Sequence, residues 1–252
     1  MPRPLVVTFG EAMLRLSAPR AQPLRLAAEL SVHVGGAEAN VAAGLAGLGF
    51  RARWFSAVAE GELGERVLGE LARHGVDTSF VTRGPGRTGL YFFEEGIGTR
   101  PASVVYDRAG SAFTLLSADD AEQATAAGLL AGAAAFVTSG ISLALGEGPR
   151  AAAAALWREA GAAGALRVLD VNYRSRLASP AEAAAQVGAL LPTADLLFVA
   201  ERDLAPLFGR LEHLRSAAAG ATIVITQGAA GATSLTASGE ARVQPALPAA
   251  DE

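Results

Sequence analysis

Residues 133–172 read AAAFVTSGISLALGEGPRAAAAALWREAGAAGALRVLDVN, and this stretch decides the fold class. The run 133–138 is apolar, 167–172 carries Val168, Leu169 and Val171, and both have the length of buried strands. Between them, 150–160 is rich in alanine and predicts a helix. Two buried strands joined by a helix predict a unit in which the strands run parallel.

The same alternation extends over most of the chain. Further strands are expected at 6–10, 51–58, 195–199 and 222–226, and further helices at 36–48, 63–74, 181–191 and 202–208. In the helix 36–48, Val41, Leu45 and Leu48 form one apolar face. The pattern predicts an α/β fold with a mostly parallel central sheet covered by helices on both faces.

Two stretches interrupt the alternation. Residues 14–34 contain no amphipathic helix, and 89–106 alternate like strands around the turn Glu95-Gly96-Ile97-Gly98. We interpret both as strands of a small β-sheet lid, inserted at about 11–34 and 87–110, in one domain that spans 1–252.

Composition excludes several classes of function. Hydrophobic residues make up 51% of the 252 residues, the net charge is −4, and no segment has the roughly 18–20 uninterrupted apolar residues of a membrane span. A nucleic-acid partner is not expected, because it would need a basic surface. Cysteine is absent, and all 21 basic residues are arginine, which excludes a thiol nucleophile and a Walker A lysine. We expect a cytoplasmic protein that acts on small molecules.

Familiar catalytic motifs are missing from the sequence. The three histidines are not spaced as metal ligands, and no serine lies in G-x-S-x-G. G-x-G-x-x-G is absent as well, which argues against a nicotinamide-dependent oxidoreductase.

Four other elements are candidates for a site. Gly35-Gly36 opens a helix that carries Asn40, an arrangement equally typical of a plain turn and of a ligand site. The polar run 170–174, Asp-Val-Asn-Tyr-Arg, follows a strand, where ligands of α/β sheets bind, and we favour a functional interpretation. Tyr91, Tyr106 and Arg108 could bind a hydroxylated acid, although packing alone would explain them. Residues 226–231, Thr-Gln-Gly-Ala-Ala-Gly, fit either a phosphate-binding turn or an ordinary one.

In this order, the elements resemble the ribokinase-like (PfkB) family of carbohydrate kinases. The resemblance rests on Gly10-Glu11, on Gly35-Gly36-Ala37-x-x-Asn40-Val41-Ala42 and on Thr226-x-Gly228-x-x-Gly231, and it extends from about residue 6 to 243. Three segments look most like those of 2-keto-3-deoxygluconate kinases: Thr88-Gly89-Leu90-Tyr91, Tyr106-x-Arg108-x-Gly110-Ser111-Ala112 and Asp170-Val171-Asn172-Tyr173-Arg174.

The resemblance implies a ribokinase-like three-layer sandwich and ATP-dependent phosphorylation of 2-keto-3-deoxygluconate at its terminal hydroxyl, with Mg²⁺. It also implies a homodimer formed through the lid. The implied sugar-acid pocket is lined by Gly35, Gly36, Asn40, Tyr91, Tyr106, Arg108 and Arg174. The implied ATP site is bordered by Asn172, Thr226, Gly228 and Gly231. No direct metal ligand is implied.

Two segments depart from the family pattern. The family's N-x-x-E is replaced by Ala200-Glu201-Arg202-Asp203. The family's D-x-x-G-A-G-D supplies an anion hole and the catalytic base, but it does not occur here, and Asp251 has no G-A-G before it. We therefore expect a domain truncated at its C-terminus, with no catalytic base in this chain.

Two alternatives stay open at this point. One is a fructokinase, ribokinase or nucleoside kinase of the same family, and Arg108→Ala should impair such an enzyme less than a kinase for an acidic sugar. The other is a sugar-acid binding protein without catalytic activity.

Overall fold

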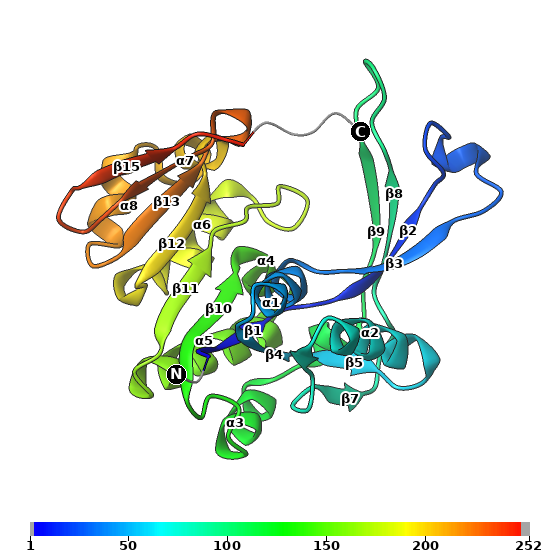
Figure 1. Cartoon of the computed structure of the whole chain (residues 1–252), viewed down its shortest axis with the longest axis horizontal. Helices are drawn as coiled ribbons and strands as arrows, with labels where there is room; N and C mark the ends of the chain where they lie inside the picture. Colours follow the sequence, from blue (N-terminus) through cyan, green and yellow to red (C-terminus); the bar gives the residue numbers. More distant parts are fainter. Residues whose placement is uncertain (1–2, 248–252) are drawn as a thin grey trace.

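The computed structural model describes residues 3–247. At its centre lies a nine-stranded sheet with the order β15-β14-β13-β12-β11-β10-β1-β4-β6 (Figure 1). Its strands are β1 (Leu5–Phe9), β4 (Arg51–Phe55), β6 (Val76–Asp77), β10 (Ala133–Ser139), β11 (Leu166–Asp170), β12 (Leu196–Ala200), β13 (Thr222–Thr226), β14 (Ala232–Leu235) and β15 (Ala241–Gln244). Neighbours from β6 to β13 are parallel, whereas β14 and β15 are antiparallel. The predicted α/β fold with a mostly parallel sheet is confirmed.

Helices cover both faces of this sheet. They are α1 (Ala37–Gly47), α2 (Glu62–Arg73), α3 (Ala118–Ala126), α4 (Gly140–Ala144), α5 (Glu147–Ala162), α6 (Pro180–Gly188), α7 (Glu201–Phe208) and α8 (Leu211–Ala217), with 3₁₀ turns at Leu24–Leu26, Ala112–Leu115, Leu191–Thr193 and Gly228–Ala230. Successive side chains of a strand point to opposite faces. Accordingly, Trp54 packs with α1 and α2, whereas Phe55 packs in a second cluster with α5. The two clusters on opposite faces make a three-layer arrangement.

The buried face of α1 differs from the apolar face expected from the sequence. Val41 is 41% exposed and Leu48 is 78% exposed, whereas Ala39 and Ala42 are buried. Small side chains face the sheet because α1 packs directly over β1 and β4, where longer side chains would not fit. The assumption that the largest apolar residues mark the buried face is therefore wrong for this helix.

The expected strand 51–58 is also two strands rather than one. The chain leaves the central sheet after β4, and β5 (Ala57–Ala59) pairs with β7 (Thr82–Gly84) in a separate two-stranded sheet. One continuous strand-like segment therefore contributes strands to two different sheets. Period-2 alternation does not show where the chain leaves one sheet for the other.

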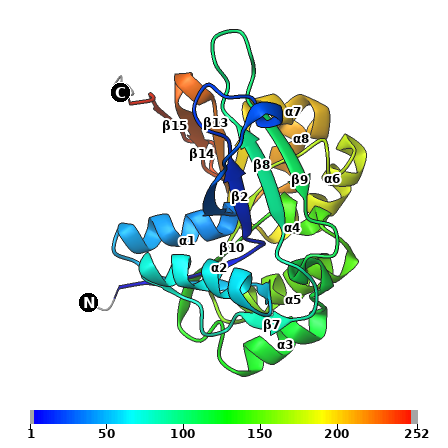
Figure 2. The ribbon, with the colours of Figure 1, turned by 90° about the vertical axis from the view of Figure 1, so that its right-hand side faces the viewer.

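A four-stranded sheet with the order β3-β2-β8-β9 stands beside the central sheet (Figures 1 and 2). Its strands are β2 (Met13–Ser17), β3 (Ser31–Gly35), β8 (Leu90–Glu94) and β9 (Ser103–Asp107). They lie in the two stretches that interrupt the strand–helix alternation, and we call this sheet the lid. Residues 10–12 connect the carboxyl end of β1 directly to β2, so the lid lies next to the edge where parallel α/β sheets bind ligands.

Within 3–247, every helix is too short or too polar to cross a membrane.

Candidate functional site

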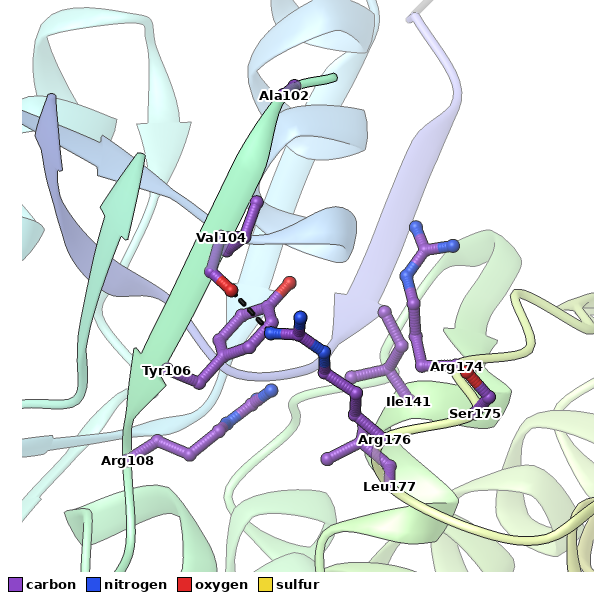
Figure 3. A pocket seen from close by; sticks show the side chains of 9 residues that line it. All are labelled: Ala102, Val104, Tyr106, Arg108, Ile141, Arg174, Ser175, Arg176 and Leu177. Carbon is purple, nitrogen blue, oxygen red and sulfur yellow. Dashed lines mark hydrogen bonds between the residues drawn. The ribbon is translucent and has the colours of Figure 1, made fainter. Parts of the chain in front are cut away.

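A cleft separates the lid from the central sheet. It consists of two adjoining cavities of about 310 and about 420 Å³, and both are lined by Val104, Tyr106, Arg108, Ile141 and Arg174. Figure 3 shows the larger cavity. These volumes are typical of pockets for small molecules. All seven residues expected in a sugar-acid pocket line the smaller cavity, namely Gly35, Gly36, Asn40, Tyr91, Tyr106, Arg108 and Arg174.

Strand register in the lid explains why three of its side chains face the cleft together. Arg15 of β2 lies opposite Tyr91 of β8, and Tyr91 lies opposite Tyr106 of β9. Side chains at matching register positions share one face of a sheet. The two tyrosine rings have centroids 5.8 Å apart. The lid therefore presents a row of one guanidinium and two phenols to the cleft.

The paired glycines permit close contacts at the floor of the cleft. A β-carbon on Gly35 would lie 2.3 Å from the Tyr91 hydroxyl, and one on Gly36 would lie 2.2 Å from the backbone oxygen of Glu11. Neither approach is possible for a larger residue without movement of its neighbour. Packing against Tyr91 and Glu11 therefore explains why both positions are glycine, and both glycines line the cavity beside Asn40.

Arg108 lines the cleft but is held by a buried carboxylate. Its Nε donates to Glu11 Oε2 at 2.9 Å, its Nη2 bonds to the same oxygen, and the Ser111 hydroxyl donates to Oε1 at 2.5 Å. The Glu11 side chain is 2% exposed and that of Arg108 is 11% exposed. The charge of Arg108 is therefore already balanced within the protein.

A second buried carboxylate, Glu38, lies in the first turn of α1. The hydroxyls of Ser139 and Ser142 donate to its Oε1 at 2.6 and 2.8 Å. Burial raises the pKa of Glu38 above the usual range of a glutamate, although the two serine hydrogen bonds oppose the shift. These bonds tie the glycine-bearing start of α1 to α4, which carries Ile141 of the cleft.

The four residues expected at an ATP site follow β11 and β13 and do not line the two cavities. Thr226 ends β13 and is exposed, Gly228 has open space around it, and Asn172 follows β11 with a φ of 40°. Positive φ is costly for a residue other than glycine and clusters at functional sites. At Gly231, a β-carbon would lie 2.0 Å from the backbone oxygen of Gln244, so hairpin packing explains that glycine.

Two carboxylates, Asp170 and Asp203, lie close enough to Arg174 to feel its charge, and neither lines the two cavities. Burial raises the pKa of both groups, and the Arg174 charge opposes the shift in each case. Asp203, which stands at the family's glutamate position, is 6% exposed. The part of the chain that the structure describes has no cluster of three or more groups able to hold a metal ion. Asp251 lies outside the described residues.

Comparisons with known proteins show which family the chain belongs to. The model of the pfkB family of carbohydrate kinases matches residues 3–251. The chain belongs to this family. The 2-dehydro-3-deoxygalactonokinase of Haloferax volcanii is 39% identical to it, over 90% of this chain and 72% of that protein. The 2-dehydro-3-deoxygluconokinase of Thermoproteus tenax is 32% identical over 68% of this chain, and the match spans only about half, 51%, of that relative.

Solved structures agree with the family assignment. The crystal structure of the 2-dehydro-3-deoxygluconokinase from Thermotoga maritima has a TM-score of 0.81 and 31% identity, covering 93% of this chain and 78% of that one. A PfkB protein from Polaromonas sp. JS666 has a TM-score of 0.86 and 29% identity. The resemblance stated from the sequence is confirmed, and so is the ribokinase-like fold.

Three polar side chains of this pfkB-family cleft were not recognised in the sequence as parts of a site: Glu11, Arg15 and Glu38. Glu11 bonds to a residue 97 positions away, and Glu38 bonds to serines more than 100 positions away. No local pattern could have shown these pairs. Glu11 did lie in the quoted Gly10-Glu11 motif, which was the one available signal.

Proposed function

We propose that the protein is a kinase for a 2-keto-3-deoxy sugar acid, such as 2-keto-3-deoxygluconate, and that it transfers the γ-phosphoryl group of ATP to the terminal hydroxyl. The observation that carries the proposal is that the seven residues implied by the family resemblance, which come from distant segments of the sequence, line one cavity. The named activities of the Haloferax, Thermoproteus and Thermotoga relatives support the substrate class.

The chemistry of the cleft suits such a ligand. Asn40 offers an amide that both donates and accepts, and Tyr91 and Tyr106 offer phenolic hydroxyls. These groups match the hydroxyls and the keto oxygen of a sugar acid. The cleft is also rich in arginine, the residue best suited to pair with a carboxylate.

The carboxyl ends of β11 and β13 fit a nucleotide. We place ATP beside Asn172, Thr226 and Gly228, with Gly231 fixing the hairpin that borders them. Asp170 and Asp203 have the oxygen ligands that Mg²⁺ prefers, and they would hold the ion through water. When bound, Mg-ATP supplies the phosphoryl group, with its charge partly neutralised by the metal. We assign no residue among 3–247 as the catalytic base.

The lid would act by excluding water from the bound sugar. Arg176 already reaches across the cleft from the loop after β11, and its Nη1 donates to the backbone oxygen of Val104 on β9 (Figure 3). Exclusion of water would suppress transfer of the phosphoryl group to water. A homodimer through the lid stays a proposal.

An ADP-release assay tests the proposal. Because no residue among 3–247 is assigned as the catalytic base, turnover is measured on the complete natural protein. It is supplied with Mg-ATP and with 2-keto-3-deoxygluconate, its galactonate epimer, fructose, ribose or no sugar, and sugar binding is measured in parallel by calorimetry. We expect ADP release to rise only with a 2-keto-3-deoxy acid. Binding of the acid without turnover would favour the sugar-acid binding protein, and faster turnover of fructose or ribose would favour another kinase of the family.

A further inference from the structure

A third cavity, of about 10 Å³, lies at the base of the lid. Three connections between the lid and the rest of the protein line it: residues 11–12 lead into β2, residues 87–89 lead into β8, and residues 111–113 follow β9. A cavity of this volume has room for about one water molecule. It is far too small for a sugar or a nucleotide, so it does not belong to the cleft described above.

Thr88 brings a buried hydroxyl to this cavity. The residue lines the cavity and is 9% exposed, and its Oγ1 is shielded from solvent with no hydrogen-bond partner among residues 3–247. Buried polar side chains in folded proteins are bonded either to a protein group or to an ordered water. In the segment Thr88-Gly89-Leu90-Tyr91, only Tyr91 lines the cleft. The Thr88 hydroxyl therefore needs a partner other than the sugar.

Glu11 supplies an acceptor to the same cavity. Its Oε1 lies 3.0 Å from the position that a β-carbon on Gly89 would take, so this oxygen lies beside the chain next to Thr88. Oε1 accepts one hydrogen bond, from the Ser111 hydroxyl, and a carboxylate oxygen can accept two. Arg108 already balances the charge of Glu11, which is the one carboxylate among the described residues that line the cavity. A neutral ligand such as water is therefore favoured over a cation.

We propose that this cavity binds one ordered water, which accepts a hydrogen bond from the Thr88 hydroxyl and donates one to Glu11 Oε1. The inference is independent of the proposed function. The water links the connection that carries Glu11 to the connection that carries Thr88, and Ser111 joins the third connection to the same oxygen. One hydrogen-bond network then holds all three connections at the base of the lid. A bond mediated by water is nearly as favourable in enthalpy as a direct one.

A crystal structure of the 252-residue chain, at a resolution that shows ordered water, tests this assignment. We expect one peak of water density in the cavity, within hydrogen-bond distance of Thr88 Oγ1 and Glu11 Oε1. The peak should be present in Thr88→Ser, which keeps the hydroxyl, and absent in Thr88→Val, in which a methyl group replaces it. A wild-type cavity without density, or one filled by a protein side chain, would overturn the proposal.

Urea-induced unfolding gives a second test, in which the sign of the effect decides. If Thr88 bonds to a water, Thr88→Val loses a hydrogen bond and should unfold at a urea concentration about 0.2–0.5 M below that of the wild type. If the hydroxyl has no partner, the same change removes an unsatisfied polar group and should raise that concentration. Thr8→Val is the matched control, because the Thr8 hydroxyl is also shielded without a partner among the described residues but does not line this cavity. The control should not lower the concentration, and an equal or higher value for Thr88→Val would overturn the water site.

Discussion

Replacement of Arg108 by alanine should destabilise the protein as a whole, not only its ligand site. Glu11 would keep its hydrogen bond from Ser111 but lose its counter-ion, while its side chain is only 2% exposed. Removal of one partner of a buried ion pair costs about 3–5 kcal/mol in the free energy of unfolding. In a chain of this size, that corresponds to a fall of about 6–20 °C in the melting temperature.

Calorimetric or urea-induced unfolding of the variants measures the effect. The matched control is Arg87→Ala, which breaks a neighbouring pair with Asp107 whose side chains are 41% and 49% exposed, and its unfolding should stay close to that of the wild type. The double variant Glu11→Gln/Arg108→Met should recover much of the lost stability, since no charge is left buried alone. An Arg108→Ala protein that unfolds at the same urea concentration as the wild type would refute this account of the pair.

Three further predictions concern α1 and the glycines beside it. Burial raises the pKa of Glu38, so between the unfolded and the folded pKa the folded state holds a proton that the unfolded state has released. The contribution of Glu38 to stability is therefore lost as the pH rises from the unfolded pKa through the folded one. In urea unfolding at pH 5 and pH 8, the stability of Glu38→Gln should depend less on pH than that of the wild type, and equal pH dependence would contradict this. Gly35→Ala should lower the free energy of unfolding because its β-carbon meets the Tyr91 hydroxyl. In urea-induced unfolding, the added change Tyr91→Phe, which removes that hydroxyl, should restore part of the lost stability, and no recovery would contradict this explanation. Gly44→Ala, with no atom near the added carbon, should raise the free energy of unfolding by about 0.5–1 kcal/mol, and a lower value would show that the helix is constrained there.

The fold was predictable because its signals are local. The alternation of apolar strand segments with helical segments predicts the parallel central sheet, and the interruptions at 14–34 and 89–106 predict the strands of the lid. The face of α1 was not predictable in the same way, since tight packing on the sheet selects Ala39 and Ala42 over larger residues.

The candidate site was predictable only in part, because some of its residues form continuous motifs and others meet only in the folded structure. Motifs such as Gly35-Gly36 and Asp170–Arg174 are continuous in sequence, and the structure brings members of both to one cleft. The Glu11–Arg108 pair is formed across the fold, and Arg15 stands in an ordinary strand sequence, Met-Leu-Arg-Leu-Ser. Only the register between β2 and β8 shows that Arg15 shares a face with Tyr91.

A crystal structure of the protein with 2-keto-3-deoxygluconate would test the central claim most directly. The account predicts the sugar acid between the lid and the central sheet, with its carboxylate on an arginine of the cleft, its hydroxyls near Asn40 and Tyr91, and its terminal hydroxyl directed toward Asn172. A sugar acid bound outside this cleft, or bound in it with the carboxylate away from every arginine, would contradict the account.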